Sequence, residues 1–265
     1  MEERALFLRD GDAYVGTILT QGGWDPTAAN GGTVLALLGH FLEEVPSLVP
    51  MTLSRFAADL VRPVPLGRRL RTESTVLREG KKIQLVELRL LVDDVVHVRA
   101  TALRLRDADM TAADLPVSST TARPADALVP PEEATSFGEG NPDVPGFLQA
   151  IDMRRAPTVD GSASGSWLRL AVPVVAGEPV RPTARLTLGF DFANLIGLEV
   201  RTASVTMINP DVTGQVLRPP IGEWIAITGD TWVNATMGRG VSSALLSDFD
   251  GVFAMVSMSQ LVQLR

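Results

Sequence analysis

The sequence predicts an α+β protein made of two similar units, each with a long apolar helix packed on an antiparallel sheet. Three observations support this prediction. Residues 31–45 form an apolar stretch directly after a good helix N-cap, Asn30. Runs rich in Val, Leu, Ile and Thr follow it and are separated by turn residues. The second half of the chain then repeats the same order of elements.

The first helix should begin at Gly31, because the Asn30 side chain can accept a hydrogen bond from the first turn. Apolar residues at 34, 35, 37, 38, 41, 42 and 45 require most of its surface to be buried. Gly31 and Gly32 each weaken the first turn by roughly 1 kcal/mol relative to alanine. That cost is explained either by a ligand close to their N–H groups or by a tightly packed strand.

In the first half, we expect strands over residues 13–20, 51–61, 69–78, 82–92 and 95–105. Glu79-Gly80 and Asp93-Asp94 are predicted to be hairpin turns. The Pro-rich residues 111–146 cannot form a packed core and are predicted to be a linker between domains. Phe137 and Phe147 indicate that parts of this region lie against a surface.

The second half should contain a helix over residues 181–195, opened by Pro182 at a first helical position. Strands are expected over residues 167–175, 203–208, 214–218, 224–233, 241–247 and 252–264. Residues 60–67 also resemble residues 216–222, each with an Arg-Pro pair. We therefore predict domains at 1–110 and 147–265, with sheets paired edge to edge as one continuous sheet.

Composition excludes several classes of function. The 265 residues carry a net charge of −7 and no long basic run, which disfavours nucleic-acid binding. The chain has no cysteine, which excludes disulfides, thiolate metal sites and a cysteine nucleophile. The first residues are charged, and no apolar stretch is long enough to span a membrane. We expect a cytoplasmic protein.

The order of these motifs resembles a known fold. Asn30-Gly31-Gly32 opens a buried helix, and antiparallel strands follow with Val61-Arg62-Pro63 at a bend and Arg78-Glu79-Gly80 at a hairpin. This order is similar to the hot-dog fold, in which a long central helix is wrapped by an antiparallel β-sheet. Two copies in one chain resemble the double hot-dog acyl-CoA thioesterases of the thioesterase II type.

This resemblance implies a catalytic site in the second unit. In that family an Asp in the second helix, a Ser or Thr early in the following strand and a Gln in the last strand hold the hydrolytic water. Asp191 and Gln260 match the Asp and the Gln. Asn209 occupies the Ser/Thr position, which is a departure from the family pattern, and Thr206 or Thr213 takes this place if the register is shifted.

Asp191 is notable without the resemblance, because it lies between Phe190 and Phe192 in an apolar helix. A buried, unpaired carboxylate costs several kcal/mol. Such a group either forms an ion pair, with Arg185 or Arg201 here, or serves chemistry. A catalytic carboxylate could activate water or attack a thioester directly and form an anhydride.

The glycines of the first helix suggest the other part of a composite site. Gly31 and Gly32, next to Asn30, could donate their N–H groups to a thioester carbonyl. One half would then bind the carbonyl, and the other half would supply the carboxylate. Five apolar residues of the two helices are expected to line the acyl site: Val34, Leu37, Phe41, Leu186 and Phe190.

The predicted function is hydrolysis of a fatty or related acyl thioester, of coenzyme A or of an acyl carrier protein, without metal or cofactor. A non-catalytic acyl-thioester or lipid-binding protein is the alternative. A hydratase or dehydratase is disfavoured because His40 and His97 are isolated from each other. Metal binding is disfavoured because no His/Asp/Glu cluster has metal-ligand spacing. By analogy with other hot-dog sheets, a homo-oligomer is expected.

Overall fold

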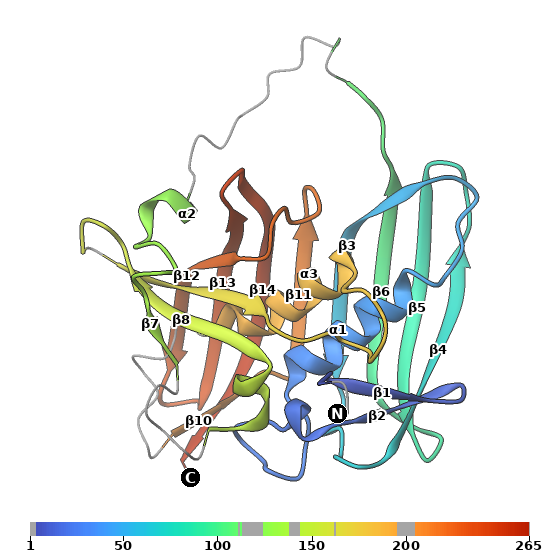
Figure 1. Cartoon of the computed structure of the whole chain (residues 1–265), viewed down its shortest axis with the longest axis horizontal. Helices are drawn as coiled ribbons and strands as arrows, with labels where there is room; N and C mark the ends of the chain where they lie inside the picture. Colours follow the sequence, from blue (N-terminus) through green and yellow to red (C-terminus); the bar gives the residue numbers. More distant parts are fainter. Residues whose placement is uncertain are drawn as a thin grey trace.

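A single large antiparallel sheet organises the protein, and two helices lie on its concave side (Figure 1). The structure is a computed structural model that describes residues 4–110, 112, 124–137, 144–161, 163–194 and 205–264. The sheet has 14 strands in the order β1-β2-β4-β5-β6-β3-β11-β14-β13-β12-β9-β8-β7, with β10 paired to β14. No helix among the described residues is long and apolar enough to cross a membrane.

The first half follows the predicted order closely. Its elements are β1 (Phe7–Asp10), β2 (Ala13–Gly16), the short 3-10 helix η1 (Ile18–Thr20), α1 (Gly31–Leu42), β3 (Met51–Leu60), β4 (Arg69–Arg78), β5 (Ile83–Val92) and β6 (Val95–Arg106). The Asn30 side chain accepts a hydrogen bond from the Thr33 N–H, which confirms the predicted N-cap. Asp93 and Asp94 have positive φ angles, as the predicted tight hairpin turn requires.

The second half contains more elements than the sequence predicted. They are α2 (Pro124–Ala127), β7 (Thr135–Ser136), η2 (Gly146–Gln149), β8 (Ile151–Pro157), β9 (Ser164–Leu170), α3 (Pro182–Asp191), β10 (Val205–Ile208), β11 (Asp211–Val216), β12 (Ile225–Asn234), β13 (Arg239–Asp248) and β14 (Gly251–Leu264). Strands β1, β7 and β8 were not predicted. The strand expected over 167–175 ends at Leu170, and the helix expected over 181–195 ends at Asp191.

Strands β3 and β11 join the two halves into one sheet. Asp59 pairs with Asp211 and Arg55 with Gln215 in an antiparallel register. Each strand has its own partner on the other side, β6 for β3 and β14 for β11. This pairing satisfies backbone groups that would otherwise form two open edges, and it confirms the predicted continuous sheet.

Helices α1 and α3 cross in direct contact at the centre of the molecule (Figure 1). The Thr187 hydroxyl donates a hydrogen bond of 2.8 Å to the Leu35 carbonyl, across the two halves. A Cβ on Gly39 would lie 2.2 Å from that hydroxyl oxygen, so only glycine fits at the crossing. The close approach fixes the N-terminus of α1 relative to the C-terminal end of α3.

Part of the predicted linker packs on the outer side of the sheet. Ala125 and Leu128 are buried against Trp167, whose indole N–H donates to the Val129 carbonyl at 2.9 Å. Phe137 and Phe147 also contact the main core, which confirms the prediction that they lie against a surface. Composition concealed this packing, because only a few apolar residues among many polar ones make it.

Buried His40 belongs to a charged cluster that joins the C-terminal end of α1 to the second half. Its Nε2 lies 2.9 Å from a Glu178 carboxylate oxygen, and Arg9 forms an ion pair with the same carboxylate at 2.8 Å. Arg181 donates to the His40 carbonyl and forms ion pairs with Glu44 and Glu178. Since a carboxylate only accepts hydrogen bonds, Nε2 carries the proton. Burial lowers the pKa of His40 despite the opposing hydrogen bond to Glu178.

This shift predicts how stability depends on pH. The unfolded chain binds a proton at His40 near pH 6.5, before the folded protein does, so the free energy of unfolding should fall as pH decreases below about 6.5. Urea unfolding at about pH 8 and about pH 5.5 measures this loss. His40→Gln should show a smaller loss than the wild type. An equal loss of unfolding free energy in both proteins would show that protonation of His40 is not its cause.

Candidate active site

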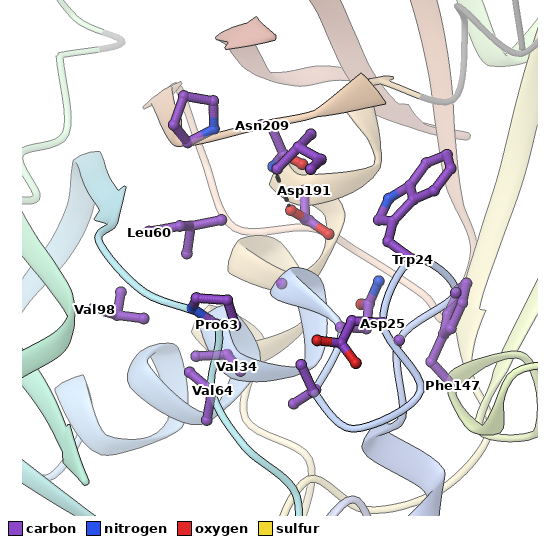
Figure 2. Close-up of a pocket in the computed structure, with 18 of the residues that line it drawn as sticks. Trp24, Asp25, Val34, Leu60, Pro63, Val64, Val98, Phe147, Asp191 and Asn209 are labelled. Atoms are coloured by element: carbon purple, nitrogen blue, oxygen red, sulfur yellow. Dashed lines mark hydrogen bonds between the residues drawn. The ribbon is translucent and has the colours of Figure 1, made fainter. Parts of the chain in front are cut away.

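A cavity of about 430 Å³ lies where the N-terminus of α1 meets the C-terminal end of α3. Its buried floor includes Ala28, Val34, Val64, Val98 and Phe192. Trp24 and Phe147 lie on one side of Asp191, and Leu60, Pro63 and Val98 lie on the other (Figure 2). The cavity falls in the size range of small-molecule sites and is mostly apolar with a few polar groups.

Asp191, the last residue of α3, is 5% exposed and lines this cavity. One of its carboxylate oxygens accepts a hydrogen bond of 2.7 Å from the Gly32 N–H. The other accepts one of 2.6 Å from the Asn209 side-chain amide (Figure 2). The carboxylate thus lies at the N-terminus of a helix from the other half, where the helix dipole favours a negative charge.

Asn209 follows β10 and is almost fully buried at the cavity wall. The NH₂ group of Asn209, and not its carbonyl oxygen, faces Asp191, because a carboxylate only accepts hydrogen bonds. Its carbonyl oxygen accepts from the Asn194 side chain at 3.5 Å. Asn194 is buried, lines the cavity and was not predicted, although it follows Asp191 by three residues.

The three residues at the start of α1 take different positions. Asn30 and Gly31 line the cavity, and the Asn30 side chain caps the helix. Gly32 lies behind them, with its N–H directed to Asp191 rather than to the cavity. A Cβ on Gly31 would lie 2.6 Å from an Asp191 oxygen, so the glycine allows the carboxylate its close approach. Of the two predicted donors, the Gly32 N–H is therefore engaged with Asp191, whereas Gly31 lines the cavity.

Gln260 lies apart from this group. It is buried on β14, where its amide donates to the Ser242 hydroxyl of β13 at 2.8 Å. Its own carbonyl oxygen is buried without a hydrogen-bond partner among the described residues. The next residue, Leu261, pairs with Ile208, so Gln260 is close to Asn209 along the sheet without lining the cavity.

Other expectations about the surroundings need correction. Only Val34 of the five predicted lining residues reaches the cavity; Leu37, Phe41, Leu186 and Phe190 pack in the core between helices and sheet. Arg185 donates to the carbonyls of Gly222 and Pro220, not to Asp191. The other predicted partner, Arg201, lies outside the described residues.

In the part of the chain that the structure describes, acidic and histidine side chains approach one another at one place that spacing did not predict. His40, Glu44 and Glu178 could together present three ligand atoms to a metal ion. However, Arg9 and Arg181 form ion pairs with both glutamates. Two guanidinium groups already neutralise this charge, so the cluster is better described as an ion-pair network that joins the two halves.

Residues 20–105 match the family model of the acyl-CoA thioesterase N-terminal domain. This match covers about a third of the chain, all of it in the N-terminal half. The matched segment contains the start of α1 with Asn30, Gly31 and Gly32, together with β3 to β6. It does not reach Asp191, Asn209 or Gln260. No curated protein matches the sequence.

Several solved structures share the fold of almost the whole chain. A candidate thioesterase II from Thermobifida fusca is 19% identical with a TM-score of 0.72, covering 97% of this chain and 95% of that one. An acyl-CoA thioesterase II from Mycobacterium marinum is 15% identical with a TM-score of 0.66, covering 97% and 94%. A protein described as having a hot-dog fold, from Alicyclobacillus acidocaldarius, is 17% identical with a TM-score of 0.65, covering 98% and 95%. The chain therefore has a hot-dog fold.

Proposed function

We propose that the protein hydrolyses acyl thioesters, with Asp191 activating the attacking water. The observation that carries this proposal is the Asp191 carboxylate at the wall of an apolar cavity, held by donors from both halves of the chain. An apolar cavity suits an acyl chain, and a carboxylate fixed at its wall can accept a proton from water.

The proposed reaction uses each of these groups in turn. Asp191 takes a proton from water as the water oxygen attacks the thioester carbonyl carbon, and the oxyanion that forms accepts a hydrogen bond from the Gly31 N–H. The intermediate collapses, the C–S bond breaks, and the thiolate leaving group recovers the proton from Asp191. The hydrogen bonds from Gly32 and Asn209 use one lone pair of each carboxylate oxygen, and each oxygen has a second lone pair that can accept a proton from water.

Gln260 and Asn209 favour a second candidate function, binding of acyl thioesters without turnover. Asn209 stands where the family has Ser or Thr, and its NH₂ group faces Asp191. Gln260 donates to Ser242 and does not line the cavity.

In the hydrolytic proposal, the Asn209 carbonyl oxygen and the Gln260 amide hold the water together with Asp191. This role requires the Gln260 side chain to turn from Ser242 toward Asn209.

The same proposal includes a tandem, or double, hot-dog organisation. The first unit comprises residues 1–110 with α1 as its central helix, residues 111–146 link the units, and the second unit comprises residues 147–265 with α3. Pairing of β3 with β11 and contact of α1 with α3 support this division. The site then lies between the units, with the carbonyl donor from one and the carboxylate from the other.

Thiol release from acyl-CoAs of increasing chain length tests the function directly. A hydrolase should release thiol with a preferred chain length. Saturable binding of the same acyl-CoAs without thiol release would replace the hydrolase by the binding protein. A change in a double bond or hydroxyl group without thiol release would indicate a hydratase or dehydratase instead.

A further inference from the structure

Among the described residues that line the cavity, Arg62 is the only cationic one. It lies at the exposed mouth, between Val61 and Pro63, directly after β3. Its guanidinium donates to the Val96 carbonyl at 2.7 Å, and its backbone N–H donates to the His97 carbonyl. The backbone bond anchors the residue, and the bond to Val96 uses one terminal nitrogen of the guanidinium, which leaves its other N–H groups for a ligand. Arg62 forms no ion pair with any residue that the structure describes.

The internal repeat makes this lack of an acidic partner informative. Arg218 occupies the matching position of the second half, in the other Arg-Pro pair. There both guanidinium nitrogens donate to the buried Asp248 carboxylate, at 2.6 and 2.7 Å, and one also donates to the Gly251 carbonyl. Arg218 is thus a structural arginine, whereas Arg62 has its charge available at the cavity mouth.

The cavity lining also carries a negative charge at Asp25, next to Trp24, whereas Pro63, the neighbour of Arg62, lies on the other side of Asp191 (Figure 2). Asp25, beside Trp24, accepts hydrogen bonds from the backbone and hydroxyl of Thr27 at 2.8 and 2.6 Å. These bonds lower the pKa of Asp25, so it is anionic at neutral pH. A phosphate at the mouth would be repelled on the Asp25 side and attracted on the Arg62 side. The surrounding protein, with its net charge of −7, gives no general attraction for an anion.

We propose that Arg62 binds a phosphate of the phosphopantetheine arm that carries the acyl group. The inference rests on the proposed function and adds the orientation of the thioester. The carrier leaves the cavity over Arg62, the thioester lies beside Asp191 and Gly31, and the acyl group extends to the far side between Trp24 and Phe147 (Figure 2). Guanidinium is well suited to this task because it binds phosphate through two parallel N–H groups.

Inert thioethers test the proposal without requiring turnover. An S-alkyl chain of one length is attached to coenzyme A, dephospho-coenzyme A, 4′-phosphopantetheine and pantetheine, and the four affinities are measured by calorimetry. The wild type should bind the phosphate-bearing forms about tenfold more tightly than the pantetheine form, as expected for one exposed charged contact. Arg62→Gln should abolish this difference and leave the pantetheine form unchanged, whereas Arg62→Lys should keep most of it.

Arg106→Gln is the matched control, because Arg106 lies at the other end of the β3–β6 pair and is exposed. It should bind all four thioethers as the wild type does. If the 4′-phosphopantetheine form binds as tightly as the coenzyme A form, Arg62 binds the phosphate that coenzyme A and acyl carrier proteins share. If only the coenzyme A forms bind tightly, Arg62 contacts a phosphate outside the phosphopantetheine arm, and the proposal is wrong.

Two further results would overturn the inference. One is an unchanged phosphate preference in Arg62→Gln, and the other is an equal loss of affinity for all four thioethers. Neither result depends on hydrolysis. A wild type that binds the thioethers but releases no thiol from the matching thioesters would refute the proposed activity and leave the role of Arg62 intact.

Discussion

Replacing Asp191 by asparagine should lower thiol release by about 10²- to 10⁴-fold, the range expected for loss of a general base. The amide cannot accept the proton of the attacking water. The fold should tolerate the change, because Asn209 can turn its own amide and present its oxygen to the new NH₂ group, while the Gly32 N–H still finds an oxygen acceptor. The measurement is thiol release under saturating acyl-CoA.

Asp230→Asn is the matched control for this variant, since Asp230 is exposed on β12, away from the cavity. It should hydrolyse acyl-CoA as the wild type does. Affinity for an inert S-alkyl thioether should remain close to the wild-type value in both variants. If thiol release by Asp191→Asn stays within a few fold of the wild type, Asp191 is not the base.

Gly31→Ala should separate activity from stability. The added Cβ would lie 2.6 Å from an Asp191 oxygen and 3.1 Å from the carboxylate carbon, so the carboxylate must move. A displacement of about 1 Å can cost about 10²-fold in rate. Alanine in the first turn also favours the helix by roughly 1 kcal/mol over glycine. We therefore expect about a 10²-fold loss of thiol release with little change in the denaturant midpoint.

Gly39→Ala provides the contrast on the same helix. There the Cβ would meet the Thr187 hydroxyl at 2.2 Å and the Thr183 carbonyl at 2.8 Å, where α1 crosses α3. Overpacking of this kind typically costs about 1–3 kcal/mol, so the free energy of unfolding should fall. If Gly31→Ala lost stability instead and kept its activity, the carboxylate would not depend on the glycine for its position.

Local signals in the sequence predicted most elements correctly. Asn30 before an apolar run defined the start of α1, and the Asp93-Asp94 pair defined a hairpin. The strands that the sequence did not predict lack such signals. Strand β8 carries Asp152, Arg154 and Arg155, whose charges hide its alternation. In the folded protein, Asp152 forms ion pairs with Arg154 and with Arg169 from the neighbouring strand.

The site was predictable only in part, because its geometry depends on contacts between distant residues. The environment of Asp191 indicated a special role, yet its partner Gly32 lies 159 positions earlier in the chain. No local pattern could show that the Gly32 N–H faces the carboxylate while Gly31 faces the cavity. The hydrogen bond from Gln260 to Ser242 is likewise set by the register of β13 and β14. Arg62 was visible within a repeat, but only the structure showed that no described acidic residue pairs with it as Asp248 pairs with Arg218.

A single turnover in ¹⁸O-labelled water, with enzyme in excess over acyl-CoA, tests most directly whether Asp191 activates water. Mass spectrometry of the product acid, of the intact protein after acid quench and of the peptide that contains Asp191 gives the answer. Water activation predicts one labelled oxygen in the acid, no acyl-protein adduct and an unlabelled Asp191. An acylated protein, or label in Asp191, would show that the carboxylate attacks the thioester itself and would contradict the proposed mechanism.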